Sequence, residues 1–392
     1  MNVLFSLTNL SIGGAQMFVL NLANAFSKDP DFTVCIYDQN PEYSSDSLYS
    51  FCDDKIEIIN YSKNKLLRFL ILKFNGLIKR LGFKFDFRKW YSNRVFLKTI
   101  KKRNIHLVNS QMSESDFLCG ELLESSVILV LTLHGEFELY LNKKRDETVL
   151  KINLLLDKRP RIIYTADKNY HAISEHIVKR CLGVNKIYIG MDPHNFKIQN
   201  LSKEEIFSND EVFVLGMVSR GIPEKGWEFL INVFKILSTG NDNFRLLLVG
   251  EGEYIQSTVK NANDQKIILF QYANNFQDYF SCYQLMDLFV FPTFFEGESV
   301  PTVVAESLYW SVPVIANDHA EIKNMISVSN ELAGEVIRIE SAEQMMKNYV
   351  SVINKFKSDL ELRNHKKKLC KLAYDKFDIL NIKDQYKKVF LN

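Results

Sequence analysis

The sequence predicts an α/β protein with two doubly wound domains, each built on a parallel sheet. Short apolar runs alternate with segments of helical spacing, which is typical of parallel strands joined by crossover helices. This alternation begins at residue 3 and restarts at residue 211, after a more polar stretch at 192–210. A chain of 392 residues is long enough for two or three domains.

The first half opens with a strand, a glycine turn and a helix. Residues 3–7 are apolar except for Ser6, Gly13 and Gly14 form the turn, and residues 16–26 have helical spacing. Further strands are predicted at 33–37, 56–59, 105–110 and 127–134, with a helix near 116–123. The turn is not a Gly-x-Gly-x-x-Gly sequence, so a dinucleotide site is not predicted.

The second half follows the same pattern. Residues 211–218 predict a strand, 219–226 a glycine and proline turn, and 227–237 a helix. Four more strands are predicted at 244–249, 266–270, 288–291 and 312–315. Because ligands of such sheets bind at the carboxyl ends of the strands, we expect two sets of binding loops that could face one cleft.

The overall composition excludes a general binder of polyanions such as nucleic acid. Forty-nine Lys and Arg residues are balanced by 47 Asp and Glu residues, for a formal net charge of +2. The six cysteines form no Cys-x-x-Cys pair, so reduced thiols and a cytoplasmic location are expected. The N-terminal sequence does not resemble a signal peptide, and no apolar stretch approaches the ~18 residues of a membrane span.

Residues 61–106 form a basic segment that differs from the rest of the chain. It holds 14 Lys and Arg residues and one acidic residue, Asp86. Within it, residues 66–81 interleave apolar side chains with cations, which is typical of an amphipathic helix on an anionic bilayer. This interpretation places the protein on the inner face of the cell membrane. The alternative is an ordinary surface helix with a solvated basic face, while calmodulin-like or nucleic-acid partners of this segment would require extra assumptions.

The stretch 291–306 carries the most specific pattern. It begins at the end of a predicted strand, and Pro301 favours a helix that starts at that residue. The main-chain amides of Thr302 and Val303 would then lie at a positive helix end, which suits a diphosphate. Glu306 follows one turn later and can accept two hydrogen bonds from a ribose diol.

Four other residues are candidates for ligand contacts. Glu298 lies in the loop before this helix. Arg220 and Lys225 share the turn 219–226, where two cations can neutralise a leaving diphosphate without a metal ion. His134 ends a strand, so its ring is expected in the ligand cleft. The alternatives are a solvated turn for the two cations and a structural role for the histidine.

Metal binding is not predicted, because the sequence lacks zinc-type spacings. Asp29-Pro-Asp31 spells the Asp-x-Asp of metal-dependent sugar transferases. However, it lies between a helix and the second predicted strand, at the wrong end of the sheet. We therefore interpret it as a turn.

Taken together, these motifs resemble the family 4 retaining glycosyltransferases. The similarity follows chain order through Gly13–Asn24, Leu133–Gly135, Tyr170–Ser174, Lys186–Asp192, Val218–Gly226 and Glu298–Glu306. The last segment matches the Glu-x7-Glu motif, which is the most specific element. Two positions depart from the family pattern, since Gln16 stands where Glu is usual and Ile189 where Asn is usual.

The resemblance implies a GT-B fold, with two Rossmann-like domains facing a central cleft. It implies an acceptor-side domain at 1–192, a nucleotide-sugar domain at 193–372, and a helix at 373–392 that crosses back to the first domain. Glu298 and His134 would be catalytic and contact the donor sugar. The implied donor-binding residues are Gly14, Arg220, Lys225, Ser299, Thr302, Val303 and Glu306. The donor would be a UDP- or GDP-linked sugar, with no metal and no cofactor.

The function predicted in this way is retaining, metal-independent transfer of a hexose to a glycan or lipid-linked acceptor in cell-surface polysaccharide biosynthesis. One alternative is a non-catalytic protein that binds a sugar nucleotide or glycan and assists another glycosyltransferase. The departures at Gln16 and Ile189 leave this alternative open. A second alternative is a sugar-nucleotide epimerase of the same fold.

Overall fold

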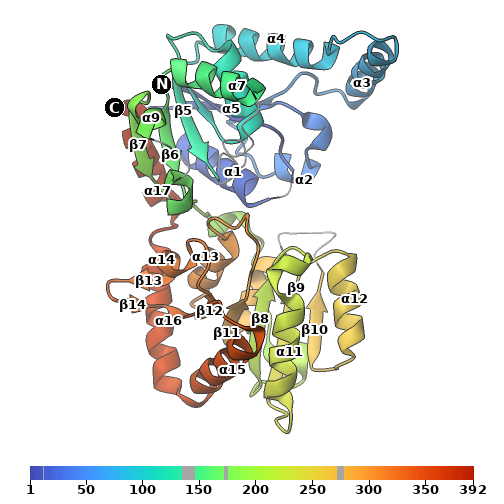
Figure 1. Ribbon diagram of the computed structural model, residues 1–392, viewed down its shortest axis with the longest axis vertical. Coiled ribbons are helices and arrows are strands. Elements are labelled where there is room, and N and C mark those ends of the chain that lie inside the picture. Colours follow the sequence, from blue (N-terminus) through green and yellow to red (C-terminus); the bar gives the residue numbers. More distant parts are fainter. Residues whose placement is uncertain (12, 135–145, 172–174, 272–277) are drawn as a thin grey trace. The chain divides into compact units, whose positions relative to one another are not determined.

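The computed structural model describes residues 1–11, 13–134, 146–171, 175–271 and 278–392. Contacts divide it into two compact units, each with a parallel sheet and helices (Figure 1). Unit 1 comprises Met1–Gly190 and Ile379–Asn392, and unit 2 comprises Met191–Asp378. Two parts of the predicted motifs, Gly135 and 172–174, lie outside the described residues, as does Ile12 just before the glycine turn.

The sheet of unit 1 has seven parallel strands in the order β3-β2-β1-β4-β5-β6-β7. The order reverses between β1 and β4, which makes their carboxyl ends the expected ligand edge. Two of the strands, β6 and β7, were not predicted, because their short sequences form weak apolar runs. The bounds are β1 Asn2–Leu7, β2 Thr33–Asp38, β3 Glu57–Ile59, β4 Leu107–Ser110, β5 Ile128–Leu133, β6 Arg161–Tyr164 and β7 Gly183–Lys186.

Helices cover both faces of this sheet. On one face, α1 and the last helix α17 pack through Phe26 and Phe390, whose rings stack at 5.1 Å, and both rings contact Phe5 of β1. On the other face, Leu118 and Leu155 of α5 and α7 join the core beneath β1, β4 and β5. The helix bounds are α1 Gly14–Ser27, α2 Asp46–Tyr49, α3 Lys65–Arg80, α4 Phe87–Lys102, α5 Ser113–Leu122, α7 Asp146–Asp157, α8 Asp167–His171, α9 Glu175–Lys179 and α17 Ile379–Leu391, with a 3-10 turn η1 at Pro41–Tyr43.

The Asp29-Pro-Asp31 sequence forms a turn, as predicted, and this turn holds α17. Lys387 of α17 contacts the carboxylates of Asp29 at 2.9 Å and Asp31 at 3.0 Å. Lys383 of the same helix lies 3.6 Å from Asp29. These ion pairs fix the end of the chain on unit 1.

The sheet of unit 2 has six parallel strands in the order β10-β9-β8-β11-β12-β15. Here the order reverses between β8 and β11, so their carboxyl ends form the corresponding edge. A separate antiparallel pair, β13 and β14, lies outside this sheet. The bounds are β8 Phe213–Val218, β9 Phe244–Val249, β10 Ile267–Phe270, β11 Leu288–Phe291, β12 Val314–Asn317, β13 Ser327–Val328, β14 Glu331–Leu332 and β15 Gly334–Ile337.

Buried apolar rows on the helices of unit 2 pack against its sheet. Trp227, Leu230 and Phe234 of α11 are fully buried. The helix bounds are α10 Lys203–Phe207, α11 Trp227–Ser238, α12 Glu253–Ala262, α13 Thr302–Tyr309, α14 Ile322–Ile326, α15 Ala342–Ser358 and α16 Leu360–Tyr374, with 3-10 turns η2 Pro193–Asn195, η3 Pro223–Lys225 and η4 Asp278–Leu285. Because α16 continues to Tyr374, the helix that returns to unit 1 begins at Ile379 rather than at 373.

The cysteines are unpaired, as predicted, and four of the six are buried. Burial raises the pKa of the Cys35 thiol to about 12, so this thiol stays protonated. Within the described ranges, none of the helices combines the length and the apolar character needed to cross a bilayer.

Candidate active site

The helix α13 begins one residue later than predicted. Pro301 has ψ of 114° and is the residue that precedes the helix, and Thr302 is its first residue. Thr302 and Val303 therefore occupy the first turn, where main-chain N–H groups have no partner inside the helix. These groups and the positive end of the helix dipole are features that favour an anion at the end of the loop that follows β11.

Glu306 lies one turn into α13 and is almost fully buried. Tyr279 donates a hydrogen bond to its Oε1, and Tyr283 donates one to its Oε2, both at 2.9 Å. Burial raises the pKa of Glu306 to about 7, although hydrogen bonds from Tyr283, Tyr279 and Thr302 oppose this shift. A carboxylate has about four acceptor positions, so Glu306 can still accept from a ligand.

Lys225 and Glu298 form a buried ion pair in unit 2. The Nζ atom of Lys225 contacts Oε2 of Glu298, and Thr293 donates a hydrogen bond to the same oxygen at 3.3 Å. Burial lowers the pKa of Lys225, while the charge of Glu298 acts in the opposite direction. The loop after β8 and the loop after β11 thus meet through their charged side chains.

The ring of Phe295 lies beneath both predicted cations. The Nζ of Lys225 is 4.6 Å from the ring centre, and the guanidinium carbon of Arg220 is 5.3 Å from it. A ring in this position attracts two cations that would otherwise repel each other. The structure therefore brings Arg220, Lys225 and Glu298 together, as the sequence predicted for Arg220 and Lys225.

The turn that carries these cations depends on Gly226. Its φ is +83°, in the left-handed region, and a Cβ atom there would lie 2.3 Å from the main-chain oxygen of Pro292. Only glycine meets both conditions without strain. The close approach of this turn to the loop after β11 is what allows Lys225 to reach Glu298.

In unit 1, His134 directly follows β5 and Gly14 begins α1. His134 contacts Gln111, with 2.8 Å between Nε2 of the ring and Oε1 of the amide. Burial lowers the pKa of His134 to about 4, so the ring is neutral near pH 7. The ring of Phe18 in α1 packs against it edge-on, with centres 5.9 Å apart.

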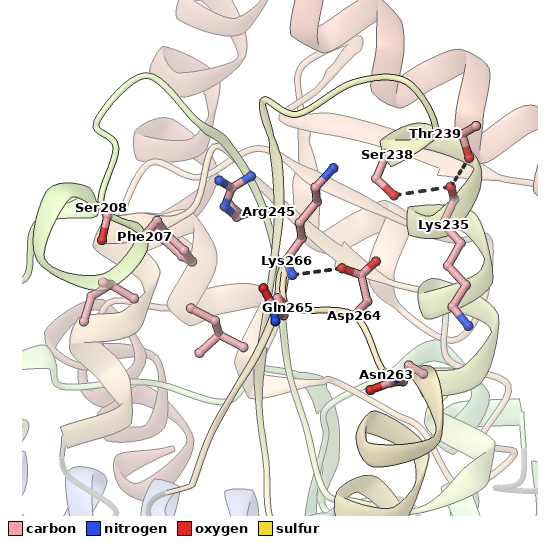
Figure 2. A pocket seen from close by; sticks show the side chains of 13 residues that line it. Phe207, Ser208, Lys235, Ser238, Thr239, Arg245, Asn263, Asp264, Gln265 and Lys266 are labelled. Carbon is pink, nitrogen blue, oxygen red and sulfur yellow. Dashed lines mark hydrogen bonds between the residues drawn. The ribbon is translucent and has the colours of Figure 1, made fainter.

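A polar pocket of about 880 Å³ lies elsewhere in unit 2 (Figure 2). Its lining includes Lys235, Arg245 and Lys266 but none of the predicted site residues. Arg245 and Lys266 stand at the amino ends of β9 and β10, opposite the edge where ligands of such sheets bind. In addition, Lys266 pairs with Asp242 at 2.7 Å. We therefore do not assign the active site to this pocket.

Four residues that contact the predicted site residues were not predicted from the sequence. Phe295 lies within the motif at 291–306, so its location in the sequence could have indicated that it belongs to the site. Gln111 directly follows β4, as His134 directly follows β5. Tyr279 and Tyr283 are four residues apart in η4, and nothing in the sequence connects them with Glu306. No group of three or more metal-ligating side chains occurs in the part of the chain that the structure describes.

Comparison with known proteins gives a family match for part of this chain. Residues 212–355, within unit 2, match the family model described as glycosyl transferases group 1. This chain carries a glycosyl transferases group 1 domain. The matched residues include Arg220, Lys225, Glu298 and Glu306, so for this part of the chain the predicted similarity to a glycosyltransferase family is confirmed.

Similar proteins occur in bacterial cell-surface biosynthesis. The capsular polysaccharide biosynthesis glycosyltransferase CapM of Staphylococcus aureus is 32% identical over 138 residues, which span 33% of this chain and about a third (34%) of CapM. The GalNAc-alpha-(1->4)-GalNAc-alpha-(1->3)-diNAcBac-PP-undecaprenol alpha-1,4-N-acetyl-D-galactosaminyltransferase of Campylobacter jejuni is 20% identical over 392 residues, which cover 99% of this chain and 98% of that enzyme.

The fold is also that of solved glycosyltransferases. The crystal structure of Anabaena HepE in complex with UDP has a TM-score of 0.68 at 14% sequence identity, covering 100% of this chain and 99% of that one. At this identity the similarity shows the fold alone. The two units with their parallel sheets have the GT-B fold, which confirms the predicted fold class.

Proposed function

We propose that this glycosyl transferases group 1 protein transfers a hexose from a nucleotide-sugar donor to a glycan or lipid-linked acceptor, with retention of configuration. The observation that carries the proposal is the group of Arg220, Lys225 and Glu298 around Phe295, with Glu298 and Phe295 in the loop that leads into α13. In this arrangement two cations and a helix end stand where a diphosphate would bind, and a carboxylate stands beside them.

The transfer breaks the bond between the anomeric carbon and the diphosphate oxygen. It forms a bond from that carbon to the acceptor oxygen, and the proton of the acceptor hydroxyl passes to the departing diphosphate oxygen. Negative charge develops on the departing diphosphate, where Arg220, Lys225 and the amides of Thr302 and Val303 stabilise it without a metal ion. Glu306 accepts hydrogen bonds from the ribose diol, while Glu298 and His134 contact the sugar. The family resemblance also assigns donor contacts to Gly14 and Ser299.

A donor-hydrolysis assay tests this function directly. Purified protein is incubated with a panel of UDP- and GDP-linked sugars, and released nucleotide diphosphate is measured with Glu306→Ala as the control. Release of nucleotide diphosphate by the wild type but not by the variant supports the glycosyltransferase function. A donor that stabilises the protein but is never cleaved would support the non-catalytic alternative, and a changed sugar with no released diphosphate would indicate an epimerase.

We further propose that the acceptor is presented at a membrane surface, to which α3 binds. The amphipathic helix predicted at 66–81 is present as Lys65–Arg80, beside α4 at the margin of unit 1 (Figure 1). Ile71 and Asn75 are its buried residues, one turn apart. Five of the exposed apolar side chains follow a different row of this helix and its C-terminal end, at Leu66, Leu70, Phe74, Leu77 and Leu81, and Leu67, Phe69 and Leu72 are exposed beside them.

This exposure favours a membrane over the alternative of a solvated surface helix. A surface helix buries its apolar row, whereas Leu66 and Leu81 are each 66% exposed. Eleven of the 26 large apolar side chains that are exposed in the described residues lie between 66 and 90. Exposed cations border the row at Lys73 and Arg80. Apolar side chains flanked by cations match an anionic bilayer surface.

Co-sedimentation with vesicles tests this surface. The wild type should sediment with phosphatidylglycerol vesicles, not with phosphatidylcholine vesicles, and salt should weaken binding because it screens charges beyond ~8 Å. Leu70→Ser/Leu77→Ser should reduce binding at least about tenfold, since burying one leucine is worth about 1.5–3 kcal/mol. The matched control Leu360→Ser/Leu372→Ser changes two leucines of similar exposure on α16. Protein that stays in the supernatant at low salt contradicts the proposal.

A further inference from the structure

A buried chain of hydrogen bonds runs from the main chain of β5 to the ring of His134. Asn109 and Val130 are paired in the sheet, and β-strand side chains alternate between faces. Asn109, Gln111, Thr132 and His134 therefore project to the same face, which α1 and α17 cover. Asn109, Gln111 and Thr132 are buried. Their polar groups must satisfy one another, because water does not reach them.

The orientation of the two side-chain amides in this chain of hydrogen bonds, those of Asn109 and Gln111, follows from the main-chain oxygen of Val130. The carbonyl oxygen of Val130 can only accept, so the group that contacts it at 3.2 Å must be the Nδ2 amide of Asn109. The same Nδ2 also donates to Oγ1 of Thr132 at 3.1 Å. Oδ1 of Asn109 therefore faces Gln111 and accepts a hydrogen bond from its Nε2.

This orientation determines which nitrogen of His134 carries the proton. Since Nε2 of Gln111 donates to Asn109, its Oε1 is the atom that faces the histidine, at 2.8 Å from Nε2 of the ring. An amide oxygen can only accept, so Nε2 of His134 must be protonated. In the neutral ring the other nitrogen, Nδ1, is then an acceptor. Nδ1 is buried and has no hydrogen-bond partner within the described ranges.

We propose that Gln111 is a positioning residue that holds His134 as the Nε2–H tautomer and leaves Nδ1 to accept a hydrogen bond from a substrate hydroxyl. His134 then acts as an acceptor, not as a cation that binds phosphate or as a general acid. The identity of the hydroxyl as that of a sugar rests on the proposed function, whereas the tautomer does not.

The surroundings of the ring are consistent with a neutral histidine. Phe18 faces it from α1 and Gln111 from the end of β4. From α17, Tyr386 contacts Phe18 and lies 3.2 Å from Oγ1 of Thr132. None of these groups is charged, and the pKa of His134 is lowered by burial alone.

The tautomer can be read directly by NMR of the full chain with ¹⁵N-labelled histidine. His134→Phe removes one of the seven histidine signals and so assigns it. We expect Nδ1 of the wild type to show the shift of an unprotonated nitrogen, and Nε2 that of a protonated one, from about pH 5.5 to 8. A signal from the Nδ1–H tautomer, or from a doubly protonated ring near pH 7, overturns the proposal without any assay of activity.

Two variants of Gln111 separate positioning from packing. Gln111→Leu keeps the approximate volume but removes the acceptor, so the ring should populate both tautomers, with turnover falling about tenfold or more at unchanged UDP affinity. Gln111→Glu places a carboxylate beside Nε2 and should raise the pKa of His134 by about 1–3. A leucine variant that folds and keeps the pure Nε2–H tautomer contradicts the role of Gln111. If neither variant folds, the wild-type spectrum still decides whether the tautomer is the proposed one.

Discussion

Lys225 contacts the carboxylate of Glu298 inside unit 2, and the two residues come from loops after different strands of the sheet. Only 5% of the lysine side chain and 11% of the glutamate side chain are exposed. The ammonium group therefore has a fixed partner before any donor binds. A diphosphate would have to share Lys225 with Glu298, which couples the binding of the nucleotide to the position of the carboxylate at the sugar.

Removing either cation should weaken binding of the nucleotide. For Arg220→Ala we expect UDP or GDP affinity to fall by ~1.5–3 kcal/mol, because a charge-assisted hydrogen bond to the diphosphate is lost. Isothermal titration calorimetry measures this loss, with Arg245→Ala in the remote pocket as the control. Equal affinity of wild type and a folded Arg220→Ala protein would contradict the assignment.

Because of the ion pair, substitutions of Lys225 and Glu298 should have non-additive effects on the free energy of unfolding. Lys225→Met leaves the carboxylate of Glu298 buried without its partner, so we expect a loss of about 3–5 kcal/mol in the free energy of unfolding. Adding Glu298→Gln removes the charge, and the double variant should be more stable than the sum of the single losses by about 0.5–3 kcal/mol. Urea denaturation of the wild type, the two single variants and the double variant gives this coupling. If the two single losses in stability simply add, the ion pair does not form.

The raised pKa of Glu306 predicts a pH-dependent stability. Since this pKa is about 7 in the folded protein and 4.5 in the reference state, the folded protein holds the proton more tightly. The resulting stabilisation is complete below about pH 4.5 and is lost as the pH rises through about 7. Between about pH 5 and pH 8, the free energy of unfolding of the wild type should fall by on the order of 3 kcal/mol relative to that of Glu306→Gln.

Urea denaturation of these two proteins across that range checks the difference. Glu340→Gln, at an exposed glutamate, is the control and should follow the wild type. Parallel curves for wild type and Glu306→Gln would show that the carboxyl group is not protonated in the folded state.

Contacts to the sugar should affect turnover more than nucleotide affinity. We expect Glu298→Ala and His134→Ala to lower the rate at saturating donor, because both residues are assigned to the sugar end of the donor. Their affinity for UDP alone should change less than that of Arg220→Ala. Steady-state kinetics with calorimetry measures both quantities. Normal turnover combined with weak donor binding would reverse the assigned roles.

Removal of divalent metal ions by a chelator should not lower the transferase activity. Arg220, Lys225 and the first turn of α13 supply the positive charge that a divalent ion provides in metal-dependent transferases. Full activity is therefore expected in excess EDTA. Loss of activity with EDTA and its return with magnesium or manganese would require a metal in the mechanism.

The sequence alone was sufficient for the strand-helix alternation, the family motifs and the cation and carboxylate positions. These features depend on local pattern, because a buried parallel strand is a short apolar run and a helix has its own period. The helix 65–80 was also predictable, since its apolar and basic residues recur at helical spacing. In contrast, β7 has the sequence Gly-Val-Asn-Lys and becomes a strand by pairing with β6.

The tertiary structure decided which side chains hold the predicted ones. Tyr279 and Tyr283 reach Glu306 from a 3-10 turn more than 20 residues earlier, and Gln111 reaches His134 from the neighbouring strand. It also decided that the apolar row of α3 is exposed rather than buried. Such contacts join residues that are distant in the chain, so they depend on how the elements pack and not on any local spacing. The sequence therefore determined the chemical groups of the site, and packing determined their protonation and orientation.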